Sequence, residues 1–277
     1  MILQTYKNIE DYLVEILAEE ANLNVSQIRE RLTQIGKKYT IQAIYKVLKN
    51  LQEGGVVVKI NKCYSLRIPW ALNLEHLSNQ IRATYLESPL LAEILPDINK
   101  KEIWHFNNLL RLNDFWSQIL LILIKQSKKK ILLGYNPHPW FHLVQTKQEE
   151  QYIKSINLAR GKLYLIIGGR TYLDKWVEKF FDKNTVAHSF GRSVFEEKGL
   201  DYINVIDDYI LTVKLDGGTT KEIDNLYKNT DSIEKMNLHN VLKIFNGKVK
   251  AGIWLEKNPQ KAEKIKGRFT RFFGIKF

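Results

Sequence analysis

Two histidines are the residues of this chain whose spacing comes nearest to a chemical site. His138 and His142 stand four positions apart, as two metal ligands on one helix would, but Pro139 lies between them and interrupts that geometry. A loop or packing role is therefore the favoured interpretation of both. No serine or cysteine stands in the strand-to-helix turn typical of a nucleophile, and Cys63 falls within a predicted hairpin.

The acidic and glycine pairs of the chain also indicate structure rather than chemistry. Asp207 and Asp208 are adjacent, so they would point to opposite faces of a strand, which favours a turn. Gly168-Gly169 and Gly217-Gly218 belong to no phosphate-binding loop and to no dinucleotide fingerprint. The sequence therefore predicts no catalytic residue, no metal site and no cofactor.

Basic residues are distributed unevenly over the first quarter of the chain. Positions 1–27 carry one base against five acids, whereas positions 28–68 carry nine bases against two acids, a net charge of +7. Lys and Arg gathered on one face gain free energy by releasing counterions from nucleic acid. We therefore expect double-stranded DNA as a partner, with a solvated basic surface as the alternative.

The elements that would position these bases are three short helices and a hairpin. Apolar residues at helical spacing predict helices between Ile9 and Leu51, the second opened by Asn24 and the third by Thr40. Two β-rich runs flank Asn61-Lys62, which predicts a hairpin because Asn accepts a positive φ. The buried stripes of the second and third helices are expected to include Ile35, Ile41 and Tyr45.

The stretch from Thr40 to Leu66, TIQAIYKVLKNLQEGGVVVKINKCYSL, resembles the recognition helix and wing of winged helix-turn-helix transcription regulators of the PadR, MarR and TrmB-like kinds. The resemblance implies that the third helix enters the major groove while the wing holds the flanking backbone. A winged helix used for protein contacts is the alternative. The residues expected to bind DNA are Lys38, Thr40, Gln42, Ala43, Lys46, Lys49, Lys59 and Lys62.

The region after the hairpin is predicted to be helical and then to change character. Pro69-Trp70 marks the end of the hairpin, and helical patterns cover Ile81 to Leu95 and Trp104 to Gln126. This connector, residues 70–129, would dimerise two chains or form part of the core of the second domain.

From Lys130 onward, strands alternate with helices, which is typical of an α/β domain. A hairpin is expected to turn at Asn246-Gly247, followed by a closing helix. The fold class is thus α/β, or α+β overall. The predicted domains are a winged helix-turn-helix at 1–69, the connector at 70–129, and an α/β effector or dimerisation domain at 130–277.

The order of elements in this last domain is similar to the phospholipase-D-like domain that follows the winged helix in TrmB-type regulators. Phospholipase-D nucleases carry a His-x-Lys motif with an Asp further on, and the histidine is their nucleophile. None of the six histidines in this chain has a lysine two residues later. The resemblance therefore implies a catalytically inactive domain.

Composition limits the class of protein. The chain has 277 residues, a net charge of +12 and 44% hydrophobic residues, which is globular composition with room for two domains. A single cysteine excludes an intramolecular disulfide and favours the reducing cytoplasm. The most apolar run, Ile119 to Ile124, is far shorter than a membrane span.

Together these observations predict a cytoplasmic DNA-binding transcription regulator without enzymatic activity. It would be a homodimer that reads a palindromic operator, with a small-molecule effector as an option. One alternative is a nuclease-related or defence-associated nucleic-acid enzyme that uses the winged helix to deliver its substrate. The other is a protein-interaction adaptor.

Overall fold

The computed structural model describes residues 8–86, 97–98, 100–191 and 201–276. The chain divides into two compact units, Met1–Ser88 and Pro89–Phe277, each with its own hydrophobic core. The helix predicted from Ile81 to Leu95 is present as far as Leu86, and the rest of that prediction lies outside the described residues. No helix in these ranges is long and apolar enough to span a bilayer.

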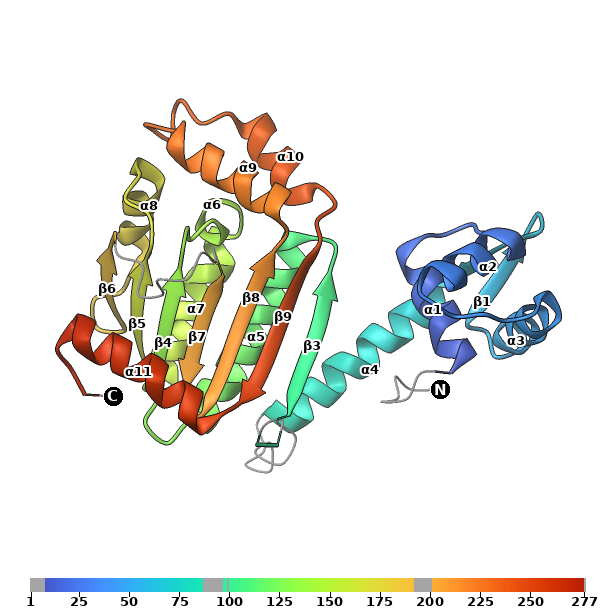
Figure 1. The fold of residues 1–277 in the computed structure, drawn as a ribbon, viewed down its shortest axis with the longest axis horizontal. Coiled ribbons are helices and arrows are strands. Elements are labelled where there is room, and N and C mark those ends of the chain that lie inside the picture. The colour runs from blue at the N-terminus through green and yellow to red at the C-terminus, as the bar shows by residue number, and fades with distance from the viewer. Residues whose placement is uncertain (1–7, 87–96, 99, 192–200, 277) are drawn as a thin grey trace. The chain divides into compact units, whose positions relative to one another are not determined.

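The N-terminal unit has the three helices and the hairpin expected from the sequence (Figure 1). The cap predictions are confirmed: Asn24 and Gln27 exchange hydrogen bonds with each other's backbone N–H groups, and Thr40 Oγ1 accepts from the Ala43 N–H at 3.1 Å. The elements are α1 (Ile9–Glu19), α2 (Val25–Gln34), α3 (Ile41–Glu53), β1 (Val57–Ile60), β2 (Cys63–Leu66) and α4 (Ile68–Leu86).

The hairpin prediction is confirmed in register. Ile60 pairs with Cys63, and the two residues between them, Asn61 and Lys62, have φ of 47° and 68°. Positive φ at both central residues gives the turn whose twist matches that of the flanking strands. A backbone bridge from Leu23 to Tyr64 ties the loop after α1 to the second strand.

Three side chains predicted to be buried in this unit are exposed instead: Ile35, Ile41 and Tyr45, at 51%, 40% and 49%. Ile44 and Leu48 on α3 are fully buried and already supply the contact with α1 and α2. Because each residue of a helix turns by about 100°, Tyr45 points well away from the seam that Ile44 begins. Ile35 caps the end of α2 and so leaves its buried stripe.

The C-terminal unit is built on one seven-stranded mixed sheet, which confirms the predicted α/β class. The strand order is β3-β9-β8-β7-β4-β5-β6, with β4, β5 and β6 parallel and the other neighbours antiparallel. The strands are β3 (Lys101–Phe106), β4 (Ile131–Asn136), β5 (Lys162–Ile167), β6 (Val186–Phe190), β7 (Tyr202–Ile206), β8 (Tyr209–Leu215) and β9 (Ala251–Lys257). The helices are α5 (Leu109–Gln126), α6 (Phe141–Val144), α7 (Thr146–Leu158), α8 (Tyr172–Trp176), the 3-10 turn η2 (Val177–Phe180), α9 (Gly217–Lys228), α10 (Leu238–Asn246) and α11 (Pro259–Phe273).

Helices cover both faces of this sheet, with α5 and α7 on one side and α11 on the other (Figure 1). Successive side chains of β5 point to opposite faces of the sheet and so contribute to both hydrophobic cores. Leu163 and Leu165 pack on the α5 side, while Tyr164 and Ile166 pack on the α11 side. After the exposed Lys162, residues 163–167 (LYLII) form a run that is buried throughout, which is the pattern of a strand covered on both faces.

The predicted helix from Trp104 to Gln126 is wrong over its first turn. Trp104 lies on β3 and pairs with Ile253 of β9, and the helix begins only after Asn108, whose side chain accepts from the Arg111 N–H. In the region expected as a connector, α4 thus lies in the first unit, while β3 and α5 lie in the second.

The hairpin predicted at Asn246-Gly247 is also wrong. Residues Val241, Ile244 and Phe245 recur at helical spacing and are buried on α10, which Asn237 caps. The β9 strand that follows pairs with β3 and β8, both distant in sequence, so no local turn forms it. The closing helix is confirmed as α11.

Candidate functional site

The residues predicted to bind DNA lie on α3, on the hairpin and in the loop before α3. Gln42, Lys46 and Lys49 are exposed on the outer face of α3, where Tyr45 joins them. Ala43 is half-buried beside them, and the Thr40 hydroxyl is engaged as the helix cap.

The other predicted bases are spread over the loop and the hairpin. Lys38 is exposed between α2 and α3, and Lys62 is exposed in the hairpin turn. Lys59 Nζ lies 5.6 Å from the centroid of the Tyr64 ring, a cation–π distance. Within α3 itself, Lys49 Nζ is 3.7 Å from Glu53, a surface ion pair of small energetic value.

A second set of functional groups lies at one edge of the large sheet. Parallel β4 and β5 and the antiparallel β8 all have their carboxyl ends there, and α6, α8 and α9 follow at the same end (Figure 1). His138 comes directly after β4, Asp174 lies on α8 after β5, and Asp224 lies on α9 after β8. This edge is where open α/β sheets place their ligand sites.

These three residues form what we call the His138 centre. His138 Nδ1 is 2.8 Å from Asp174 Oδ1, and His138 Nε2 is 3.2 Å from Asp224 Oδ1. The Asp174 side chain is fully buried, whereas that of Asp224 keeps 23% of its surface exposed. The imidazole is therefore oriented from inside by one carboxylate and meets the other on the side that solvent reaches.

The position of Asp174 is fixed by its own helix start. Its Oδ2 accepts from both the backbone N–H and the hydroxyl of Thr171 at 2.9 Å. The Asp174 N–H in turn donates to Thr171 Oγ1 at 3.4 Å, which completes a capping box. A Cβ on Gly169 would stand 2.0 Å from the same oxygen. Gly168-Gly169, predicted as a plain turn, is thus the backbone over which the Asp174 carboxylate folds.

Aromatic side chains pack around the His138 centre. The Tyr227 ring lies 4.3 Å from the imidazole, centroid to centroid, and burial raises the pKa of the Tyr202 and Tyr227 hydroxyls well above the usual value. A hollow of about 10 Å³ beside His138, Tyr202 and Asp224 has room for about one water molecule. The sequence signals that could have led to this centre are the Thr171-x-x-Asp174 box and the two glycines before it.

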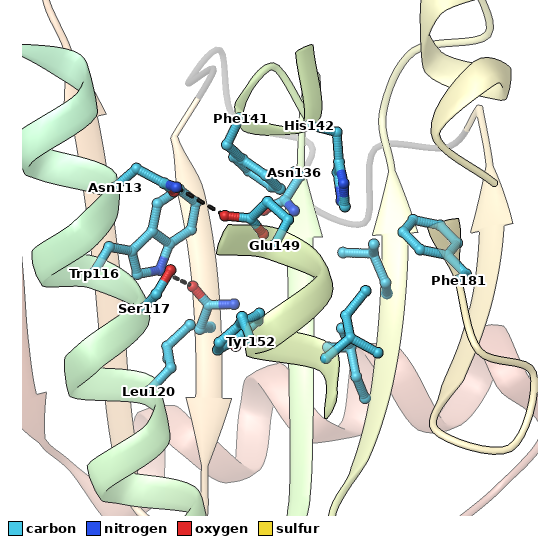
Figure 2. Close-up of a pocket in the computed structure, with 14 residues that line it drawn as sticks. Asn113, Trp116, Ser117, Leu120, Asn136, Phe141, His142, Glu149, Tyr152 and Phe181 are labelled. Atoms are coloured by element: carbon cyan, nitrogen blue, oxygen red, sulfur yellow. Dashed lines mark hydrogen bonds between the residues drawn. The ribbon is translucent and has the colours of Figure 1, made fainter. Parts of the chain in front are cut away.

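His142 lies elsewhere, in a cavity between α5 and α7 that we call the interhelical pocket (Figure 2). The ring stacks on Phe180 at 5.7 Å, and burial lowers the His142 pKa to about 3, so that the imidazole is neutral. His138 and His142, although four positions apart, thus lie in two different sites. Among the residues that the structure describes, no group of three or more His, Cys, Asp or Glu side chains is placed to hold a metal.

Glu149 places a buried carboxyl group in the interhelical pocket. Asn113 donates to Glu149 Oε1 at 2.8 Å and to Gln145 Oε1 at 3.0 Å, and Gln145 in turn donates to Asp114. Burial raises the pKa of Glu149 to about 7; the Asp114 charge adds to this, while the hydrogen bond from Asn113 opposes it. Glu149 therefore exchanges its proton near neutral pH.

No protein-family model and no curated protein matches the chain. Solved structures are similar to it, and two of them are NucT and Nuc. NucT from Helicobacter pylori is 11% identical, with a TM-score of 0.36 over 64% of this chain and 100% of its own. Nuc from Salmonella typhimurium, a phospholipase D family member, is 8% identical, with a TM-score of 0.36 over 63% of this chain and 95% of its own.

These similarities correct the functional predictions made from the sequence. The expectations of a transcription regulator of the TrmB, PadR or MarR kind and of a chain without enzymatic activity are contradicted: the solved structures similar to the chain include NucT and Nuc, the latter a phospholipase D family member. The associated expectation of operator reading is withdrawn with them.

Proposed function

We propose that this chain is a nucleic-acid enzyme whose N-terminal unit binds duplex DNA and whose C-terminal unit cleaves phosphodiester bonds at the His138 centre. The observation that carries the proposal is the imidazole held between Asp174 and Asp224 at the carboxyl edge of the sheet. A histidine with one nitrogen fixed by a buried carboxylate is the usual arrangement of a general acid or base.

The geometry supports a concerted hydrolysis. A substrate oxygen would take the place of Asp224 at His138 Nε2, and Asp174 would keep the ring in position at Nδ1. Water attacks phosphorus and gives its proton to the displaced Asp224 carboxylate. The phosphorus–oxygen ester bond breaks as His138 donates its proton to the leaving oxygen.

The basic N-terminal unit would supply the affinity for the substrate. We propose that Lys38, Lys46, Lys49, Lys59 and Lys62 contact phosphates, while Thr40, Gln42 and Ala43 lie against the groove. Because the binding unit and the His138 centre belong to one chain, bound nucleic acid is held at high effective concentration near the second unit.

We also propose that the enzyme is a homodimer. Helix α4 exposes Leu74, Leu77 and Ile81, spaced by three and four residues, as a coiled-coil seam requires. A second copy of the helix would cover them. Sedimentation should show a dimer that Leu77→Asp dissociates and that Ser78→Asp on the same helix leaves intact; a wild-type monomer at micromolar concentration would refute the dimer.

Cleavage assays test the enzyme directly. The full chain is incubated with labelled duplex and single-stranded DNA and RNA, with and without divalent cations, and products are separated on denaturing gels. We expect His138→Gln and Asp174→Asn to lower the cleavage rate at least about 100-fold, the usual value of a general acid or base. His239→Gln, a matched change at an exposed histidine, should leave the rate unchanged.

Two results would refute the proposal. One is cleavage that survives His138→Gln. The other is a wild-type chain that binds these substrates but cleaves none of them under any of these conditions.

A further inference from the structure

One side of the large sheet is left uncovered near its β3 edge. The buried residues beneath α11 belong to β4, β5, β7 and the first part of β8, and among the described residues no helix of this unit lies in front of β9 and β3 (Figure 1). Because Trp104, Val213 and Ile253 pack on the α5 side, the residues that alternate with them point to the uncovered side. We call this surface the open face; it includes Lys101, Ile103 and His105 of β3, Lys214 of β8, and Gly252 and Trp254 of β9.

The open face presents an aromatic ring. Trp254 keeps part of its surface exposed, and Ile103, its partner across the ladder, is 46% exposed. A Cβ on Gly252 would stand 2.8 Å from Trp254 Cη2, so the indole occupies the space above the glycine and lies along the strand. The His105 ring meets the indole edge to face at 6.4 Å. An indole held along the sheet in this way offers the face of its ring to a ligand.

Two lysines stand diagonally across Trp254. Lys101 on β3 pairs with Glu256, and Lys214 on β8 pairs with Gly252, so they flank Trp254 by two residues on either side along β9. Their Nζ atoms lie 5.9 and 5.7 Å from the centroid of the indole, within the range of cation–π attraction. A ring bound on Trp254 would therefore have a cation on each of two opposite sides.

The second unit carries most of the excess positive charge of the chain. Residues 89–277 hold 31 of the 42 Lys and Arg and 21 of the 30 Asp and Glu, a net charge of +10. Helix α11, which follows β9 and lies on the same side of the sheet as the open face, has five bases and one acid. Two acids next to the open-face lysines are themselves ion-paired, Asp201 with Lys214 at 3.1 Å and Glu256 with Lys261. This surplus of positive charge is complementary to a chain of phosphates.

We propose that the open face binds single-stranded nucleic acid, with one base stacked on Trp254 and the phosphates on either side of it held by Lys101 and Lys214. Aromatic side chains combined with a basic surface bind single strands in this way, because every base has a face that can stack. In a duplex the neighbouring base pairs already cover both faces of each base. Binding at the open face does not require cleavage at the His138 centre, so this proposal and the proposed function can fail separately.

Fluorescence anisotropy with labelled DNA tests the stacking. The full chain with His138→Gln is used, so that cleavage at the His138 centre does not consume the strands. The probes are an oligothymidylate of about 12 nucleotides, an abasic strand of the same length, and the thymidylate annealed to its complement. The abasic strand has the same phosphates and no bases. We expect the thymidylate to bind at least about 5-fold more tightly than the abasic strand.

Substitutions at Trp254 locate the stacking. Trp254→Leu keeps an apolar side chain and removes the ring, so the preference for the thymidylate over the abasic strand should disappear. Trp254→Phe keeps a ring and should keep most of that preference, and both variants should bind the duplex as before. Trp176 gives the matched control, because it is half-buried with Lys179 Nζ 3.8 Å from its ring but lies on α8, outside the open face. Trp176→Leu should bind all three probes normally, and circular dichroism confirms that each variant is folded.

The salt dependence of binding tests the two lysines. Lys101→Gln and Lys214→Gln should each weaken the thymidylate and the abasic strand alike. Each should also lower the slope of log K against log salt by about 0.7, the value of one phosphate contact on a single strand. Lys154, exposed on α7 on the other side of the sheet, is the control, and Lys154→Gln should leave the slope unchanged.

Several results would overturn the proposal. The abasic strand binds as tightly as the thymidylate, or the preference for bases survives Trp254→Leu. The preference is lost equally in Trp176→Leu, or Trp254→Phe loses it as completely as Trp254→Leu, which would mean that the indole acts only through packing. A chain that shows no preference for bases but self-associates in a way that Trp254→Leu abolishes would assign the open face to a second copy instead.

Discussion

In the His138 centre, the Asp174 carboxylate occupies the space that a side chain at position 169 would need. A Cβ at position 169 would meet Asp174 Oδ2 at 2.0 Å, a distance that forces the carboxylate to move. Gly169→Ala should therefore displace the group that orients His138. We expect the cleavage rate to fall at least about 10-fold and the thermal midpoint to drop, measured on the purified full chain.

Gly267 provides the matched control for this prediction. It is exposed on α11, and a Cβ there would meet nothing within 4 Å. Gly267→Ala should leave cleavage unchanged and stabilise the chain by about 0.5–1 kcal/mol, the helix-propensity difference. Equal cleavage by the two alanine variants would show that Asp174 does not position the imidazole.

Glu149 makes the stability of the second unit depend on pH. Its pKa rises from 4.5 to about 7 on folding, so the folded state holds the proton more tightly than the unfolded state does. Stability from this group is complete below about pH 4.5 and is lost as pH rises through 7. Glu149→Gln removes the titration, so relative to wild type it should gain about 3 kcal/mol between pH 4 and pH 9, measured by urea unfolding.

Glu150 is the neighbouring residue on α7 and does not line the pocket. Glu150→Gln should therefore follow the wild-type stability at every pH. A Glu149→Gln curve parallel to wild type across this range would mean that the carboxyl is solvated in the folded protein.

Single-residue signals in the sequence are sufficient for caps and turns but not for the His138 centre. Asn24, Thr40 and Asn61 act within three residues of themselves, so their roles can be derived locally. The role proposed for His138 depends on Asp174, 36 positions away, and on Asp224, further still. Only the order of strands in the sheet brings these groups together.

At the level of elements, α3 is predicted correctly as a helix, but the sequence assigns too many of its residues to the buried face. The sequence correctly predicts the start and the buried Ile44 and Leu48 seam of this helix. It also assigns Ile41 and Tyr45 to the core, because both fit three- and four-residue spacing within one helix. Which of two adjacent stripes is buried depends on where α1 and α2 lie, and this adds an exposed Tyr45 to the proposed DNA-binding face.

The α3 helix and the hairpin should contribute to nucleic-acid binding mainly through charge. Lys46 on α3 and Lys62 in the hairpin turn are both exposed. We expect Lys46→Gln and Lys62→Gln each to weaken duplex binding several-fold and to reduce the slope of log K against log salt by about 1, measured by fluorescence anisotropy at several salt concentrations.

Lys147, exposed on α7 in the second unit, gives the control. Lys147→Gln should leave both the affinity and the salt slope unchanged. If all three lysine substitutions reduced the slope equally, binding would follow net charge alone and would not be located on the N-terminal unit.

At the scale of the whole molecule, the sequence predicts the alternation of strands and helices but not the pairing between strands that are distant in sequence. The alternation of strands and helices after Lys130 is enough to predict an α/β unit. The edge strand β3 and its partner β9 pair residues about 150 positions apart, such as Trp104 with Ile253. No local pattern marks that pairing, which is why β3 reads as helix and β9 as half of a hairpin.

The two units should unfold in separate transitions, because their cores share no residue. Leu48 belongs to the core of the first unit and Ile166 to that of the second, and both are fully buried. Replacing either by Ala leaves a cavity that costs about 2–5 kcal/mol. We expect calorimetry of the full chain to resolve two transitions, of which Leu48→Ala lowers one midpoint and Ile166→Ala the other. Five of the six tryptophans lie in the second unit, so tryptophan fluorescence should follow the Ile166→Ala shift closely and the Leu48→Ala shift hardly at all. A single transition that both substitutions lower equally would show that the units fold as one, and delivery of substrate by an independent binding unit would then have no basis in the fold.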